Sequence, residues 1–281
     1  MSTAILLSVL GGALLHASWN ALIKWEPDKL AASAAIAVGA GIVALPIALF
    51  SPMPLAAAWP WIAFSSVIHV FYFALVGYAL RHADLGVVYP LTRGSAPAFT
   101  AILAAVWLGE LLALSGWLAV GMIATGVVTL SADALLRGGL TPRTAVLAFT
   151  NAAIVVGYTL VDGIGARLSG NAVSYVAWMM AGTALLIVPL ALLFYRAQVA
   201  EKSRGFWVRT LIGGGISIAS YGIALWAMTR APIGLVAALR ETSVLFAAIL
   251  GALIFDERFG PKRWAALILI VIGIGLLRVP F

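Results

Sequence analysis

Apolar residues fill most of the chain in runs of about 20, and short polar or basic segments separate these runs. Runs of this length are typical of helices that cross the hydrocarbon core of a membrane. Stretches such as 102–106 and 267–274 do not alternate between apolar and polar positions, as the strands of a membrane β-barrel would. The pattern therefore predicts ten helical spans, at residues 3–23, 30–50, 59–80, 85–108, 112–132, 144–162, 171–195, 206–229, 233–255 and 262–279.

The composition supports the same class. Hydrophobic residues make up 63% of the 281 and charged residues 10%, whereas a soluble domain is normally about 25% charged. A mean hydropathy of +1.09 leaves too little polar surface for a water-soluble globule of this size. We therefore predict an all-α integral membrane protein in contact with the lipid bilayer.

Charge and cysteine content exclude several other classes. The net charge of +7 does not indicate a nucleic-acid partner, because the basic residues stand singly or in small groups between apolar runs. The chain has no cysteine, which excludes disulfides and thiolate metal sites. The apolar N-terminus has no basic segment before Ala4, so we interpret it as the first span and not as a cleaved signal peptide.

Part of the sequence occurs twice. Residues 78–86 (YALRHADLG) return 148 positions later as residues 226–234 (WAMTRAPIG). Ten spans then divide into two repeats of five, which we place at 1–138 and 141–281. Because five is odd, the second repeat would enter the membrane from the opposite side, so inverted repeats around a pseudo-two-fold axis in the membrane plane are predicted.

The distribution of Lys and Arg predicts the orientation. Twelve of the 17 follow odd-numbered spans, and three follow even-numbered spans. Basic residues gather on the cytoplasmic side of membrane proteins. The twelve would therefore be cytoplasmic and both termini outside; we expect the inner membrane of a bacterial cell.

Two stretches in corresponding positions resemble a known domain. The motif that ends in Trp107-Leu108-Gly109-Glu110 and the glycine-containing span after it are similar to the fourth and fifth spans of an EamA domain, and the second copy departs from this pattern where Leu245 replaces Pro97. The chain resembles the two-domain, ten-span branch of the drug/metabolite transporter superfamily. The matching stretches are 97–110, 117–121 and 126–130, then 245–257 and 264–277.

The resemblance implies a secondary carrier for small metabolites with a central cavity between its halves, and similar members export amino acids. Ten-span members are often described with both termini in the cytoplasm, which conflicts with the Lys and Arg count. Small four-span members couple transport to protons through a glutamate in the first span. The first span here has no carboxylate, which puts that mechanism in doubt; His16 or His69 is an alternative titrating group.

One face of the first span carries candidate site residues. His16, Trp19 and Asn20 are three and four positions apart, so they share a helical face. The corresponding position in the sixth span adds Tyr158. These side chains would line a substrate cavity; the alternative is that they pack against a neighbouring helix.

Aromatic side chains in the third and eighth spans are further candidates. His69 and Tyr72 lie deep in the third span, and Tyr221 lies in the eighth. Tyr78 and Trp226 are repeat equivalents near span ends. A pocket for an organic solute uses such aromatics, but residues near span ends equally suit the membrane interface, where Trp and Tyr gather.

The two embedded charges Arg93 and Glu241 occupy the same repeat position, 148 residues apart. Charges inside a span are costly and need a reason. A pseudo-two-fold axis can bring equivalent positions together, so we predict a buried ion pair between the repeats. The alternative is that these groups hold the carboxylate and ammonium of a zwitterionic substrate.

Glycines recur along the spans, including three in succession at 213–215. Small residues let membrane helices approach closely, so packing is the first interpretation. The alternative for the run at 213–215 is a flexible point at which a transporter bends.

An enzymatic role has little support, because the chain has no cysteine nucleophile, no Gly-x-Ser-x-Gly elbow and no phosphate-binding loop. No cofactor or metal is expected. We predict a carrier that exports amino acids or similar amphipathic solutes by alternating access, with a monomer expected to suffice. The alternatives are an uptake carrier for sugars or nucleotide sugars, and a membrane protein without transport activity.

Overall fold

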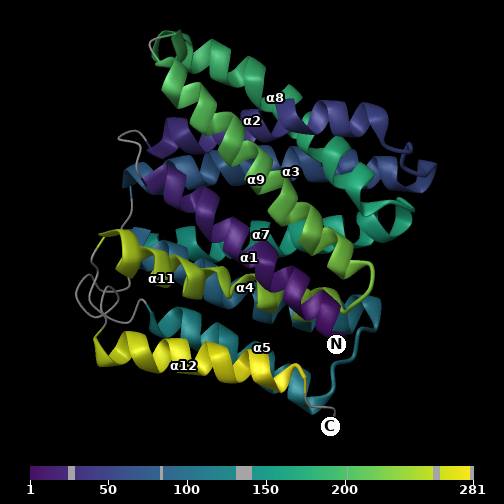
Figure 1. Ribbon diagram of the computed structural model, residues 1–281, viewed down its shortest axis with the longest axis vertical. Helices are drawn as coiled ribbons and strands as arrows, with labels where there is room; N and C mark the ends of the chain where they lie inside the picture. The colour runs from purple at the N-terminus through teal and green to yellow at the C-terminus, as the bar shows by residue number, and fades with distance from the viewer. Residues whose placement is uncertain (25–28, 83–84, 131–140, 201, 256–259, 279–281) are drawn as a thin grey trace.

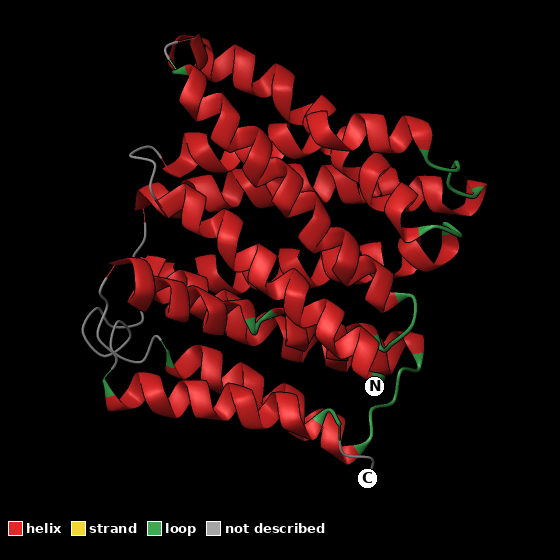
Figure 2. Cartoon of the chain, viewed as in Figure 1, coloured by secondary structure: helices red, strands yellow, loops and turns green. Residues whose placement is uncertain are grey.

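The computed structural model describes residues 1–24, 29–82, 85–130, 141–200, 202–255 and 260–278, which form helices and short connections without a strand (Figures 1 and 2). The helices are α1 (Thr3–Lys24), α2 (Lys29–Phe50), the short 3₁₀ helix η1 (Ala56–Ala58), α3 (Trp59–His82), α4 (Leu85–Leu108), α5 (Leu114–Thr129), α7 (Pro142–Leu168), α8 (Ala172–Ala200), α9 (Arg204–Met228), α10 (Ile233–Arg240), α11 (Ser243–Phe255) and α12 (Pro261–Leu276).

Length and composition identify eight stretches of the described chain that can cross a membrane, and α10 with the start of α11 forms one of them. The helix α5 is apolar but shorter, at 16 residues. Large apolar side chains such as Phe50, which is 92% exposed, cover the outside of the bundle, where lipid would contact them. The prediction of an all-helical membrane protein is confirmed, whereas ten spans and their inverted arrangement stay predictions.

Helices follow the predicted spans closely except at the sixth, where α7 continues to Leu168, and at the ninth. The apolar pattern is continuous there, but the helix stops at Arg240 and resumes at Ser243. The backbone N–H of Glu241 donates to the carbonyl of Ala238, and that of Thr242 donates to the carbonyl of Leu239. These three-residue turn bonds replace the helical pattern, so Glu241 lies at a junction between α10 and α11.

The bundle places α1, α4, α7, α9 and the α10–α11 segment in its middle. In Figure 1, α5 and α12 lie together along one side, and α2, α3 and α8 lie toward the other. Direct contacts join α5 with α12, α2 with both α8 and α9, α1 with α9, and α4 with α7. The start of α1 and the end of α12 lie at the same end of the bundle (Figure 1).

Glycines allow the closest helix contacts. At Gly214 of α9, an added Cβ would overlap the backbone of Gly39 and Ala40 in α2. The neighbouring Gly215 has no atom within 4 Å of the same position. The packing interpretation therefore fits Gly214 but does not apply to Gly215.

Candidate functional site

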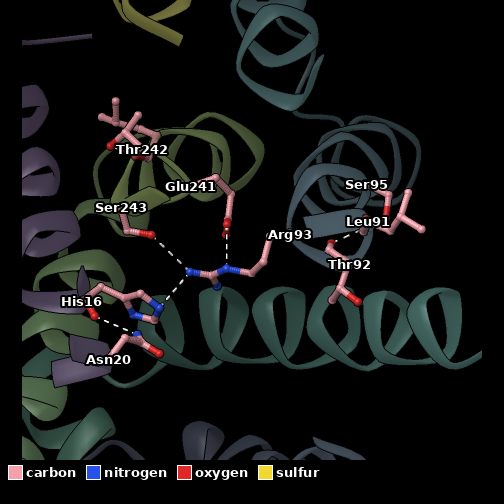
Figure 3. A network of polar contacts seen from close by, with 10 residues as sticks. His16, Asn20, Leu91, Thr92, Arg93, Ser95, Glu241, Thr242 and Ser243 are labelled. Carbon is pink, nitrogen blue, oxygen red and sulfur yellow. Dashed lines mark hydrogen bonds and ion pairs between the residues drawn. The ribbon is translucent and has the colours of Figure 1, made fainter. Parts of the chain in front are cut away.

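A buried ion pair joins α4 to the α10–α11 junction. Nε of Arg93 lies 2.9 Å from Oε2 of Glu241, and both side chains are buried (Figure 3). The pairing expected from their equivalent repeat positions is present. Arg93 is therefore neutralised from within the protein, which leaves little reason for it to hold a substrate carboxylate.

The remaining donors of Arg93 tie α1 to the same junction. Nη2 donates to Nε2 of His16 at 2.7 Å and to Oγ of Ser243 at 3.2 Å (Figure 3). Because a guanidinium only donates, Nε2 of His16 must accept and carries no proton in this arrangement. We call His16, Arg93, Glu241 and Ser243 the arginine network.

The other two candidates on the first span lie beside His16. Nδ2 of Asn20 donates to the backbone carbonyl of His16 at 2.7 Å. The Trp19 ring meets the His16 ring edge-on, with their centroids 5.0 Å apart. The predicted common face of His16, Trp19 and Asn20 is therefore present, and its histidine contacts α4.

A second polar group surrounds Asp162, which has no exposed surface. The Tyr175 hydroxyl of α8 donates to Oδ1 at 2.9 Å, and the Tyr221 hydroxyl of α9 donates to Oδ2. Gly165, one turn further along α7, makes room for Tyr175, because an added Cβ would overlap its ring. Two neutral hydroxyls thus hold a carboxylate inside the bundle.

Aromatic rings from α3, α7 and α9 pack beside this carboxylate. The His69 ring centroid is 4.7 Å from that of Tyr158 and 6.1 Å from that of Tyr221. Tyr72 lies 5.6 Å from Tyr158 between ring centroids. Four predicted candidates therefore converge, and we call them, with Asp162 and Tyr175, the tyrosine–aspartate cluster.

Arg240 connects the two groups. The guanidinium carbon of Arg240, at the end of α10, lies 4.8 Å from the centroid of the Tyr221 ring. The next residue in the chain, Glu241, belongs to the arginine network and pairs with Arg93. The arginine network and the tyrosine–aspartate cluster are thus neighbouring parts of one buried polar region.

Two predicted candidates lie apart from this region. Tyr78, near the end of α3, is 46% exposed and accepts a hydrogen bond from Nη2 of Arg143 at 3.0 Å. Trp226 lies near the end of α9, where the guanidinium carbon of Arg230 is 4.6 Å from its ring centroid. Both positions fit the membrane-interface alternative, and a role in substrate binding stays a prediction for them.

Glu110, just after α4, contacts the start of α10 and the end of α7. Gly109 adopts a φ of +67°, which turns the chain as α4 ends. Oε2 of Glu110 then accepts the backbone N–H of Ile233 at 2.7 Å, at the positive end of the α10 dipole. Nη1 of Arg167 lies 2.5 Å from Oε1. Glu110 is therefore tied to two helix ends and is not a freely solvated carboxylate.

Sequence reasoning missed Asp162, Tyr175 and Arg240. The sixth span was expected to end at residue 162, which placed its carboxylate near a membrane surface. The helix α7 instead continues to Leu168, and Asp162 lies inside it. The turn residues Ser169 and Gly170 were the available signal, because Gly170 has a φ of +73° directly after the helix.

No three His, Cys, Asp or Glu side chains come together as metal ligands within the described residues. The polar region instead combines one ion pair, one carboxylate held by hydroxyls, one stacked guanidinium and several aromatic faces. Such a combination can bind an organic solute through charge and apolar contact together.

The sequence profile of the EamA-like transporter family matches residues 3–132 and again residues 142–279. The chain belongs to the EamA-like transporter family. It is therefore a membrane transporter of small solutes, with two EamA-like domains.

Comparison with solved structures supports the fold of this EamA-like transporter. A chain described only as "Crystal structure of protein" has a TM-score of 0.73 and 19% sequence identity, over 98% of this chain and 96% of that one. At that identity the likeness concerns the fold alone. No protein among those with curated functional descriptions matches the chain.

Proposed function

We propose that this EamA-like transporter exports amino acids or similar amphipathic solutes by alternating access around the buried polar region. The observation that carries the proposal is that both domains contribute to this region. Arg93 of the first domain pairs with Glu241 of the second. His69 of the first packs against Tyr158 and Tyr221 of the second. A substrate held there would contact both halves, as rocking of one half against the other requires.

Helix contacts support inverted repeats with boundaries at 1–138 and 141–281. Each span of one repeat corresponds to the span five places later, so that α1 corresponds to α7 and α3 corresponds to α9. Replacing each helix by its counterpart turns the contact of α3 with α7 into the contact of α9 with α1. The same exchange converts the contact of α3 with α8 into that of α9 with α2. The pairs α2–α8 and α5–α12 are each exchanged with themselves, as helices around a pseudo-two-fold axis would be.

The chemistry of the region favours amphipathic solutes. Its aromatic faces suit an apolar side chain, and a small number of charges suits a small polar head. A phosphorylated solute fits less well, because Arg93 is already paired with Glu241. The chain has no phosphate-binding loop for ATP, so uphill export would draw on an ion gradient.

Flux through purified protein tests this proposal. The full chain in liposomes should move radiolabelled amino acids with apolar side chains faster than protein-free liposomes do, and a proton gradient across the membrane should be applied and omitted in parallel. In cells, overexpression should lower the content of a substrate and confer resistance to its toxic analogues. Movement of sugars or nucleotide sugars alone would favour the alternative carrier, and movement of no solute would remove the carrier proposal.

The proposed orientation can be tested by single-cysteine labelling, since the chain has no cysteine of its own. Positions 53 and 230 lie at one end of the helices, and positions 204 and 262 lie in the first turns of α9 and α12 at the other. In spheroplasts, an impermeant maleimide should label Met53→Cys and Arg230→Cys at once, but Arg204→Cys and Lys262→Cys only after permeabilisation. The unmodified chain is the blank. The opposite result would reverse the orientation, and labelling of positions 230 and 204 from one side would contradict the alternating spans.

A further inference from the structure

We propose that Asp162 and Arg240 form the recognition site for a zwitterionic amino acid, with its ammonium on Asp162 and its carboxylate on Arg240. The inference rests on the proposed function and names the residues that select the substrate. It moves zwitterion binding away from Arg93 and Glu241, which neutralise each other.

The carboxylate of Asp162 can accept more hydrogen bonds than the protein supplies within the described residues. Tyr175 and Tyr221 donate one hydroxyl each to its two oxygens. An ionised carboxylate has about four lone-pair sites, so about two stay available. No Lys, Arg or His of the described chain forms an ion pair with Asp162. A fully buried negative charge is costly without a cation, and a substrate ammonium would supply one with three N–H donors.

The rings beside Asp162 suit a cation and the apolar group attached to it. Tyr158 and Tyr221 lie with their ring centroids 6.3 Å apart, and His69 lies next to both. Tyrosine faces attract ammonium groups when the site excludes water. The same rings offer an apolar surface to an aliphatic side chain. Carboxylate and aromatic faces together thus favour an organic ammonium over a simple inorganic cation.

Arg240 is the complementary group. Its guanidinium stacks over the Tyr221 ring, and among the described residues no hydrogen bond or ion pair engages it. A guanidinium stacked by its face keeps its edge N–H donors available, and these match a carboxylate in a bidentate arrangement. Arg93 differs, because it donates to His16 and Ser243 and pairs with Glu241.

Tyr221 sets the spacing between the two charges. Its hydroxyl donates to Asp162, and its ring lies under Arg240. The carboxylate and the guanidinium are therefore separated by about one tyrosine ring, and within the described residues they form no ion pair with each other. An α-amino acid carries ammonium and carboxylate on one carbon, and hydrogen bonds of about 3 Å on either side let it bridge such a gap.

Several other titratable and charged side chains lie near Asp162, and some of them bond elsewhere. His16, Arg93 and Glu241 belong to the arginine network. His69 bonds to Ser65 of its own helix, Oγ of Ser65 lying 3.2 Å from Nδ1. Tyr175 from α8 and Tyr221 from α9 bond to the carboxylate. Tyr158 from α7 and His69 from α3 pack beside the Tyr221 ring, and Arg240 from α10 lies over that ring.

The test uses three probes that share the same apolar 3-methylbutyl chain. Leucine carries both charges, isopentylamine only the ammonium, and 4-methylpentanoate only the carboxylate. Purified full-length protein in detergent is incubated with radiolabelled leucine, and each unlabelled probe is added as a competitor. Asp162→Asn should weaken leucine and isopentylamine about tenfold or more and leave 4-methylpentanoate unchanged. Arg240→Gln should weaken leucine and 4-methylpentanoate and leave isopentylamine unchanged.

Matched controls separate recognition from general damage. Arg230→Gln removes another guanidinium stacked on an aromatic ring and should not alter competition. Thermal melting of each variant reports folding. If Asp162→Asn does not fold, Asp162→Glu keeps the charge but moves it, and should shift competition in the same direction by a smaller factor.

Several outcomes would overturn the assignment. Equal weakening of all three probes by both variants would make the residues structural, and unchanged competition would place the site elsewhere. Loss of pH-dependent flux in Asp162→Asn, with isopentylamine affinity intact, would make Asp162 a proton carrier instead. Failure of the wild type to move any amino acid would remove the proposed function as well, whereas leucine flux without the charge-selective pattern would remove this inference alone.

Discussion

Reversing one charge of the buried pair, as Arg93→Glu or as Glu241→Arg, is expected to remove most folded protein from the membrane. Each change places two like charges where Nε of Arg93 and Oε2 of Glu241 now lie 2.9 Å apart. Breaking a buried ion pair costs about 3–5 kcal/mol because it leaves a charge uncompensated. A loss of that size is a large share of the stability of a typical protein.

The double exchange Arg93→Glu with Glu241→Arg should recover part of the loss. Recovery stays partial because an arginine at 241 does not reproduce the donation from Nη2 of Arg93 to His16. Membrane yield and melting in detergent measure the effect, and Arg204→Glu, an exposed reversal at the start of α9, is the control. A double variant no more abundant than either single one would contradict the pairing as a source of stability.

The pairing of Arg93 with Glu241 was predictable from sequence, because the 148-residue repeat alone makes their positions equivalent. A positive and a negative charge buried in a membrane at equivalent repeat positions are most simply accommodated by pairing with each other, and the structure contains that pair. The shared face of His16 and Asn20 was predictable for a similar reason, since helical spacing alone decides it. What these side chains contact depends on packing between distant segments, so the bond from Arg93 to His16 was not predictable.

The features that sequence reasoning missed depend on local ends and breaks. The hydrophobic pattern runs through residues 241 and 242, yet the helix stops there, so the pattern carried no sign of the α10–α11 junction. Asp162 was placed near a membrane surface because the predicted sixth span ended at residue 162, whereas α7 continues to Leu168. In both cases the apolar periodicity located the span correctly but did not show where the helix ends. The position of the helix end determines the surroundings of Glu241 and of Asp162.

Gly214→Ala is expected to destabilise the protein, whereas Gly215→Ala is expected to stabilise it or leave it unchanged. At Gly214 the new methyl group would overlap the backbone of Gly39 and Ala40, which cannot rotate away as a side chain could. Overpacking of this kind costs about 1–3 kcal/mol. At Gly215 the methyl group meets no atom within 4 Å, and alanine favours a helix over glycine by about 0.8–1.0 kcal/mol.

Melting in detergent and solute flux, measured on both variants, distinguish the two roles of the glycine run. If close packing of α9 on α2 is its role, Gly214→Ala lowers the melting temperature and Gly215→Ala transports like the wild type. If the run is a bending point of the transport cycle, Gly215→Ala melts higher but moves solute more slowly, because the stiffer helix resists the bend. Equal melting temperatures for the two variants would contradict the close approach of Gly214 to α2. Since the two substitutions are one residue apart in the same helix, a difference between them reflects the local contact of α9 with α2 and not a general effect of placing alanine in α9.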